Sequence, residues 1–179
     1  MVGVLIHAKF NPLNFTIRTL KRGQGPMAGM AREIRLATAS DLAEIKRCAE
    51  EAYALYVPRI GKKPAPMIAD FASQIAAGHV NVCVDGDRLL GYIVLYTRDD
   101  HLHIENVAVF PSLQGTGLGR DLLAFAEDEA RRVGKTVIEL YTNQHMTENL
   151  SFYPRLGYVE LARGEEAGFA RVFYRKELD

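Results

Sequence analysis

The spacing of apolar residues changes along the chain, and each change predicts a secondary-structure element. Short apolar runs bounded by turn residues predict strands over residues 33–38, 80–84, 89–96, 102–110, 136–141, 158–161 and 170–176. Apolar residues at helical spacing predict helices over residues 38–56 and 67–77, from a glycine-rich turn to Gly134, and over 147–156. No internal repeat interrupts this order.

Several polar residues mark where these elements begin and end. Thr38-x-x-Asp41 before an apolar run is a capping box and predicts the start of the first helix. Asp85-Gly86-Asp87 between two apolar runs predicts a β-hairpin. Gly134 and Gly157 predict helix ends, and the proline-rich stretch 58–66 predicts a link between the first two helices.

The most informative segment follows the predicted strand 102–110. It runs Pro111-Ser112-Leu113-Gln114-Gly115-Thr116-Gly117-Leu118-Gly119-Arg120 and leads into an apolar-periodic helix. Glycines at alternate positions let backbone N–H groups converge on an anion, and the helix N-terminus adds partial positive charge. The sequence therefore predicts a phosphate-binding turn.

Two common phosphate-binding motifs fit this turn poorly. A P-loop needs Gly-Lys-Ser/Thr, whereas Arg120 and Asp121 follow Gly119. Gly115 and Gly117 match the first two glycines of the dinucleotide pattern G-x-G-x-x-G, and Glu139 matches its downstream acidic residue. The position of the third glycine, however, is occupied by Arg120. The strands before the turn also form a hairpin pattern and not a βαβ unit.

Gln114-x-x-Gly117-x-Gly119 resembles the Q/R-x-x-G-x-G/A pyrophosphate loop of the GNAT superfamily of N-acyltransferases. A second string, Phe152-Tyr153-Pro154-Arg155-Leu156-Gly157-Tyr158, resembles another signature of that family. The resemblance covers the chain from about Glu33 to its end. It implies an α/β (α+β) fold with a mixed, mostly antiparallel central sheet and helices on both faces.

The resemblance also implies how the coenzyme binds. Two neighbouring parallel strands would splay apart, so that the backbone of the strand before the loop takes the pantetheine arm of acetyl-CoA as an added strand would. The strands concerned end at Phe110 and Tyr141. The implied coenzyme-binding residues are Val107, Ala108, Val109, Gln114, Gly115, Thr116, Gly117, Leu118, Gly119, Arg120, Asn149 and Tyr153.

Proton transfer needs a base near the loop, because an alkyl amine with a pKa of about 10.4 is neutral in roughly one molecule in a few thousand at pH 7. Regular alternation puts His101, His103, Glu105, Val107 and Val109 on one face of the strand, with Leu102, Ile104, Asn106 and Ala108 on the other. Glu105 and His103, about 7 Å apart by strand rise, are the candidate bases. A solvated polar face is the alternative interpretation.

Tyr153 matches the position where many members of the family place a tyrosine that protonates the departing thiolate, so it is the candidate catalytic acid. A packing role is the alternative. Pro154 interrupts the predicted helix and affects the direction of the hydroxyl, which leaves Tyr141 and Tyr158 as substitute donors. Asn149 either contacts the coenzyme or caps the helix.

In this fold the link between the first two helices usually covers the acceptor. Tyr53, Tyr56 and Arg59 are the predicted substrate-binding residues, with Lys62 and Lys63 adding positive charge that would suit a carboxylate-bearing amine. Solvated lysines in a proline-rich loop are the alternative interpretation.

Composition adds limits to this picture. The 179 residues suit one core-forming domain, residues 31–179, after an N-terminal extension over residues 1–30 that contains no acidic residue. We interpret this start as an accessory extension or an over-long start, with a targeting segment as the minority interpretation. Two cysteines and no metal-type cluster predict neither a disulfide framework nor a metal site.

Lysine plus arginine and aspartate plus glutamate number 22 each, which predicts neither a nucleic-acid nor a membrane partner. We therefore expect a cytoplasmic acetyl-CoA-dependent N-acetyltransferase that acts on a primary amine of a small molecule by direct ternary-complex transfer. The alternatives are acetylation of a protein N-terminus or lysine, and an acyl-CoA-binding module without turnover. The sequence allows a homodimer but does not fix the oligomeric state, the acceptor or the acyl chain length.

Overall fold

The computed structural model describes residues 18–19 and 32–179. The N-terminal extension expected over residues 1–30 lies outside the described residues, except for Arg18–Thr19. These two residues form a short strand, β1, that pairs with the first strand of the main domain. The division of the chain at about residue 30 stays a prediction.

The described residues build one eight-stranded sheet with the order β1-β2-β3-β4-β5-β6-β8-β7. All neighbours are antiparallel except β5 and β6, which are parallel. The other strands are β2 (Glu33–Leu36), β3 (Val80–Asp85), β4 (Arg88–Thr97), β5 (Leu102–Val109), β6 (Val137–Asn143), β7 (Val159–Glu166) and β8 (Phe169–Glu177). The predicted hairpin at Asp85-Gly86-Asp87 joins β3 and β4.

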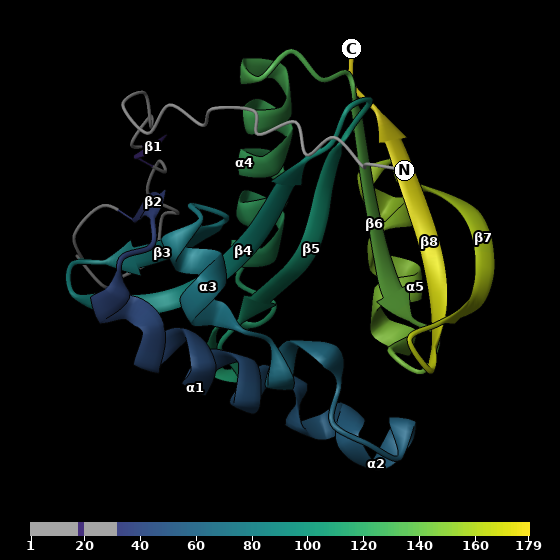
Figure 1. Cartoon of the computed structure of the whole chain (residues 1–179), viewed down its shortest axis with the longest axis horizontal. Coiled ribbons are helices and arrows are strands. Elements are labelled where there is room, and N and C mark those ends of the chain that lie inside the picture. The colour runs from purple at the N-terminus through teal and green to yellow at the C-terminus, as the bar shows by residue number, and fades with distance from the viewer. Residues whose placement is uncertain (1–17, 20–31) are drawn as a thin grey trace, which may run out of the picture.

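Helices cover both faces of the sheet (Figure 1). The first face carries α1 (Leu42–Tyr53) and α3 (Phe71–Ala76), with the short α2 (Val57–Ile60) following α1; the second carries α4 (Leu118–Arg132) and α5 (Thr147–Phe152). Two hydrophobic clusters result, one between the sheet and α1 and α3, the other between the sheet and α4. The predicted mixed sheet with helices on both faces is confirmed. No helix of the described residues is long and apolar enough to cross a membrane.

The predicted capping box at Thr38 and Asp41 is present at the start of the first helical segment, where a 3₁₀ turn over Ala39–Asp41 leads into α1. Asp41 accepts the backbone N–H of Thr38 at 2.7 Å and a bidentate pair of hydrogen bonds from the Arg35 guanidinium at 2.8 and 2.9 Å. The hydrogen bonds from Arg35 are the largest cause that lowers the pKa of Asp41, to about 2. The carboxylate thus ties β2 to the helix start.

Replacing Asp41 with asparagine is expected to lower the free energy of unfolding by about 1 kcal/mol at pH 7. Because the folded pKa is lower than the unfolded one, the charge stabilises the fold above about pH 4. That stabilisation is lost as pH falls toward 2, so the difference between the two proteins should shrink at pH 3. Urea unfolding at both pH values measures it, with the exposed Asp87→Asn as control. An equal loss at both pH values would exclude an ionic contribution from Asp41.

β5 does not alternate regularly, because it contains a β-bulge. Val94 of β4 lies opposite Asn106, but the next residue, Leu95, lies opposite Ile104, so Glu105 is the extra residue. Regular alternation predicted Ile104, Asn106 and Ala108 on one face, and this was wrong. Ile104, Val107 and Val109 pack into the cluster under α4, whereas Ala108 packs into the cluster under α1.

β5 and β6 pair over only three residues, from Leu102 opposite Ile138 to Ile104 opposite Leu140. After this point β5 continues to Val109 and β6 to Asn143 without further pairing between them. The two strands diverge as a V in the middle of the sheet (Figure 1). The bulge and the divergence begin at the same position.

Candidate functional site

The glycine-rich turn joins the end of β5 to α4. Gly115 and Gly117 have φ angles of 78° and 91°, in the left-handed region that favours glycine, and Gly117 is the N-cap of α4. Thr116 donates its hydroxyl to the Leu113 carbonyl at 2.7 Å, and Leu118 is buried in the core. Side chains of these two residues therefore stabilise the turn, and the backbone N–H of Thr116 also donates to the Leu113 carbonyl, at 3.4 Å.

A pocket of about 470 Å³, here called the large pocket, lies between this turn, the end of β5 and α5. It is lined by Leu55, Tyr56, Val107, Ala108, Val109, Gln114, Gly115, Gly117, Gly119, Arg120, Glu148, Asn149, Phe152, Tyr153 and Arg155. Ten of the twelve predicted coenzyme-binding residues thus line one cavity, the exceptions being Thr116 and Leu118. The predicted residues that line this pocket are up to 46 positions apart in the sequence, from Val107 to Tyr153.

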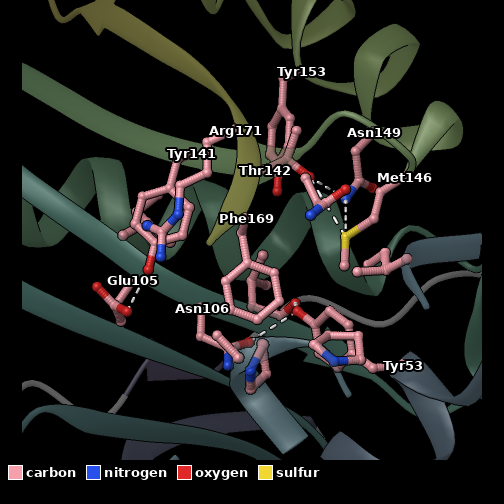
Figure 2. A pocket seen from close by; sticks show the side chains of 17 residues that line it. Tyr53, Glu105, Asn106, Tyr141, Thr142, Met146, Asn149, Tyr153, Phe169 and Arg171 are labelled. Carbon is pink, nitrogen blue, oxygen red and sulfur yellow. Dashed lines mark hydrogen bonds between the residues drawn. The ribbon is translucent and has the colours of Figure 1, made fainter. Parts of the chain in front are cut away.

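A second pocket of about 60 Å³, here called the small pocket, occupies the divergence between β5 and β6 (Figure 2). It is lined by Tyr53, Ile60, Pro64, Ala65, Pro66, Ile104, Glu105, Asn106, Val107, Tyr141, Thr142, Asn143, Met146, Asn149, Tyr153, Phe169 and Arg171. Val107, Asn149 and Tyr153 line both pockets. The two cavities are therefore adjacent, and these three residues lie between them.

Glu105 is the bulged residue, and its carboxylate lies at the small pocket. It accepts a short hydrogen bond from the Tyr141 hydroxyl, and its other oxygen lies 3.4 Å from Nε2 of His103. Burial alone would raise the pKa of Glu105, but the contacts with His103 and Tyr141 together outweigh it and hold the pKa below its ordinary value. Glu105 is thus an anion at neutral pH, and the predicted pair of His103 and Glu105 lies close together.

Tyr153 is held by packing of its ring. Its centroid lies 5.5 Å from that of Tyr174 and 5.8 Å from that of Tyr158, and the side chain is 5% exposed. Burial raises the pKa of its hydroxyl, which makes no hydrogen bond with any residue that the structure describes. The hydroxyl therefore retains its proton at neutral pH and has no competing partner among the described residues.

Pro154 does not kink α5 but ends it. α5 stops at Phe152, and a 3₁₀ turn over Pro154–Leu156 follows, with Gly157 at a φ of 85°. Of the two substitute donors, Tyr158 is buried, lines neither pocket and has a hydroxyl without a partner among the described residues. Tyr141 already donates to Glu105. Tyr153 is thus the tyrosine between the pockets.

Asn149 lies inside α5 and is not its cap, because Met146 is the N-cap residue. Its amide nitrogen donates to the Thr142 hydroxyl at 2.9 Å, across from α5 to β6 (Figure 2). This contact fixes the side chain where both pockets meet.

The segment 57–66, here called the roof segment, covers the small pocket with Ile60, Pro64, Ala65 and Pro66. Tyr53, just before it, lines the small pocket and places its hydroxyl 2.9 Å from Oδ1 of Asn106 and 3.0 Å from the Val107 carbonyl. Tyr56 lines the large pocket instead. The roof is therefore apolar where it meets the small pocket.

The cations of the roof segment do not line the small pocket. Arg59 pairs with Glu148 of α5 at 2.9 Å and lines neither pocket, and Lys62 donates to the Gly168 carbonyl at 2.6 Å with its ammonium over the Phe169 ring. Both side chains join the roof segment to the other half of the molecule. Lys63 is exposed.

Sequence analysis missed several residues of the small pocket: Asn106, Thr142, Asn143, Met146, Phe169 and Arg171. Asn106 and Asn143 are polar residues inside strands, and each is less than 10% exposed. Buried polar residues are candidates for a binding site, but the sequence alone does not show that these two are buried. Arg171 is a charged residue within the last predicted strand, and this position was the one signal in the sequence that could have marked it as a pocket residue. Among residues 32–179, no group of three or more His, Cys, Asp or Glu side chains is arranged to hold a metal ion.

The family model and the related proteins that match this chain are all acetyltransferases. The model of the acetyltransferase (GNAT) family matches residues 43–158. The chain is 38% identical over 74 residues to the uncharacterized N-acetyltransferase YvbK of Bacillus subtilis, covering 41% of this chain and 48% of that protein. It is 34% identical over 87 residues to the aminoalkylphosphonate N-acetyltransferase of Salmonella typhimurium, covering 45% of this chain and 56% of that protein. The matches span about half the length of these two relatives.

Solved structures agree on the fold. PaiA N-acetyltransferase from Thermoplasma acidophilum in complex with coenzyme A superimposes with a TM-score of 0.69 at 18% identity, over 83% of this chain and 99% of that one. YncA from Salmonella typhimurium, with its cofactor acetyl-CoA, gives a TM-score of 0.60 at 26% identity over 82% and 93% of the two chains.

Proposed function

The chain belongs to the acetyltransferase (GNAT) family, and we propose that it transfers an acetyl group from acetyl-CoA to a primary amine of a small molecule. The observation that carries this proposal is the contact between the two pockets at Val107, Asn149 and Tyr153. One pocket has a glycine-rich turn for a phosphate group, and the other has a carboxylate for an amine. A group held at their junction can pass from one ligand to the other without a covalent enzyme intermediate.

The large pocket suits a coenzyme A thioester. Backbone N–H groups of the turn at Gly115, Gly117 and Gly119, with the N-terminus of α4, would bind the pyrophosphate. The unpaired edge of β5 over Val107–Val109 would hydrogen-bond the pantetheine amides. Apart from its chain neighbours and the backbone of its own helix, a Cβ at Gly119 would meet no described atom closer than the Phe152 ring at 3.8 Å, so the space beside it is free for the ligand. Acetyl-CoA is a cosubstrate in this proposal.

Two side chains of this chain would move protons. Glu105 is ionised and lies at the small pocket, where it would accept a proton from the incoming ammonium, directly or through a water. Tyr153 is protonated and lies at the junction, where its hydroxyl would donate to the departing thiolate. The base and the acid thus come from opposite sides of the junction.

The small pocket supports a small-molecule acceptor over a protein. It holds about 60 Å³ and is covered by the roof segment, with Lys62 in contact with Gly168 on the opposite rim. An extended peptide needs an open groove, which this cover would obstruct. The Salmonella relative that acts on aminoalkylphosphonates supports the same class of acceptor. A cytoplasmic location fits a pair of buried, free cysteines, Cys48 and Cys83.

A screen of primary amines with acetyl-CoA, with release of the free CoA thiol as the readout, tests the proposal. Turnover with at least one small amine is expected, at a higher kcat/KM than with peptides that carry a free N-terminus or lysine. Acetyl-CoA binding without turnover of any amine or peptide would favour the binding module, and preference for peptides would favour the protein acetyltransferase.

Replacing Glu105 with glutamine is expected to lower kcat at pH 7 by about tenfold, below the 10²–10⁴-fold of a well-matched base, because a carboxylate with a lowered pKa is a weak base. Because its pKa is lowered, Glu105 is an anion throughout the neutral and alkaline range, so the pH dependence of kcat should follow the ionisation of the amine. The loss should therefore shrink near pH 10, where a substantial fraction of the acceptor is already neutral. A pH–rate profile measures this, with His103→Gln in parallel and the exposed Glu165→Gln as control. A loss that is constant with pH would contradict a role as base.

A further inference from the structure

Arg171 of β8 is a buried cation that neither the sequence motifs nor the proposed proton transfers use. Its side chain is 9% exposed and lines the small pocket. The guanidinium carbon lies 3.6 Å from the centre of the Tyr141 ring, and the same ring carries the hydroxyl that donates to Glu105. Figure 2 shows Glu105, Tyr141 and Arg171 grouped on one side of the cavity.

The charges of the small pocket form a complementary pair. Among its lining residues, Glu105 and Arg171 are the two charged side chains. The remaining residues of the lining are apolar, aromatic or neutral polar. A ligand that complements both charges carries a cationic group near Glu105 and an anionic group near Arg171.

Arg171 has one carboxylate partner among the described residues, Glu166, at 2.7 Å from Nη1. Glu166 belongs to the hairpin at the end of β7, and its side chain is 57% exposed. Because the Glu166 side chain is largely exposed, its carboxylate can turn into water when another anion approaches Arg171. A guanidinium has five N–H donors in a planar fork, so one partner leaves donors for a second anion, and stacking on Tyr141 fixes the plane of the fork.

We propose that Arg171 binds an anionic group of the acceptor, so that the acceptor is a small zwitterion with a carboxylate, phosphonate or phosphate a few atoms from its amine. This inference rests on the proposed function for the reaction but names the acceptor class and the residue that selects it. Arg171, over the face of the Tyr141 ring, would hold the anion, while Glu105, at the hydroxyl of the same ring, would receive the amine. The roof segment contributes no charge to this selection.

Matched acceptors test the selectivity. β-Alanine, 2-aminoethylphosphonate and O-phosphoethanolamine carry the anion, whereas β-alaninamide and n-propylamine lack it. We expect the wild-type protein to acetylate at least one of the three anionic amines with a kcat/KM at least tenfold above that of the neutral amines. Arg171→Met, which keeps the apolar stem, should raise KM for the anionic amines at least tenfold with little change in kcat. Arg171→Lys should restore part of the affinity.

Glu166→Gln is the control that separates substrate binding from a structural role. If Arg171 only holds the hairpin through Glu166, then Glu166→Gln reproduces the Arg171→Met result. If Arg171 binds the acceptor, Glu166→Gln leaves KM for the anionic amines unchanged or lowers it. Equal losses for neutral and anionic amines in Arg171→Met, or a wild-type preference for neutral amines, would overturn the inference.

Binding is measured apart from turnover, so that this inference and the proposed function can fail separately. If no amine is acetylated, the proposed function fails. Calorimetric titration of the wild-type protein and of Arg171→Met with the three anionic amines then still decides the inference. Binding that is lost in the variant supports it, and equal binding, or none to the wild-type protein, overturns it.

Discussion

Replacing Gly119 with valine is expected to abolish acetyl-CoA binding, a loss of at least about 10²-fold in affinity, while the protein stays folded. Gly119 is the second residue of α4 and lines the large pocket. A Cβ there meets only the Phe152 ring, at the ordinary contact distance of 3.8 Å. The added methyl groups would therefore occupy the space of the ligand and disturb the protein little.

Calorimetric titration with acetyl-CoA and thermal unfolding measure the two effects. Gly164→Val is the matched control, since Gly164 lies on exposed β7 with no atom within 4 Å of its Cβ position. Gly117 is a poorer choice, because at its φ of 91° any side chain is strained and a loss of binding would have two causes. Unchanged affinity in a folded Gly119→Val protein would refute the assignment of the turn to the coenzyme.

Replacing Tyr153 with phenylalanine is expected to lower kcat by about 10²-fold, as is typical when one positioned proton donor is removed. The ring contacts with Tyr158 and Tyr174 do not require the hydroxyl, and the hydroxyl makes no hydrogen bond with the described residues. Stability and acetyl-CoA affinity should therefore be preserved. Steady-state kinetics with the best amine of the screen, together with calorimetry, provide the measurement.

Tyr158→Phe is the control for this variant. Tyr158 is also buried, packs against Tyr153 and has a hydroxyl without a partner, but it lines neither pocket. Its loss should leave kcat unchanged and should not lower stability, because a buried unsatisfied hydroxyl is removed. Full activity in Tyr153→Phe would exclude Tyr153 as the acid and leave the coenzyme site untouched.

Much of the fold could be predicted from the sequence because its signals are local. The capping box at Thr38, the hairpin at Asp85-Gly86-Asp87 and the stops at Gly134 and Gly157 each depend on a few neighbouring residues. The turn at Gln114 to Arg120 is likewise a continuous segment. Its geometry follows from glycines whose positive φ angles other residues rarely adopt.

The bulge at Glu105 could not be predicted, because nothing in the alternation of β5 marks it. It becomes visible only when β5 is paired with β4, where Leu95 lies opposite Ile104 instead of Glu105. A one-residue shift reverses the faces of all the residues that follow. The prediction for the first half of the strand was therefore right, and that for Asn106 and Ala108 was wrong.

The acceptor pocket also depends on residues that are distant in sequence. Arg171 reaches Tyr141 because β6 and β8 are antiparallel neighbours, with Asn143 opposite Arg171. The charges of the roof segment were predicted to face the acceptor, and in the structure Arg59 and Lys62 contact Glu148 and the Gly168 carbonyl instead of lining the small pocket. Proximity in sequence to a substrate-binding segment does not determine where a long side chain finds its partner.

The extra residue in β5 also separates the chemistry of the site from the stability of the sheet. Glu105 belongs to neither hydrophobic cluster, whereas Ile104 and Val107 pack into one and Ala108 into the other. Substitution at position 105 therefore changes the group offered to the acceptor with little effect on packing. Leu102, Ile104, Val107 and Val109 pack into the same cluster on both sides of the bulge, so deletion of Glu105 would restore regular alternation, keep these faces and remove only the bulge and the carboxylate. Descendants of this sequence can thus exchange the functional group at this position readily, and any need for a carboxylate there would come from the proposed reaction and not from the fold.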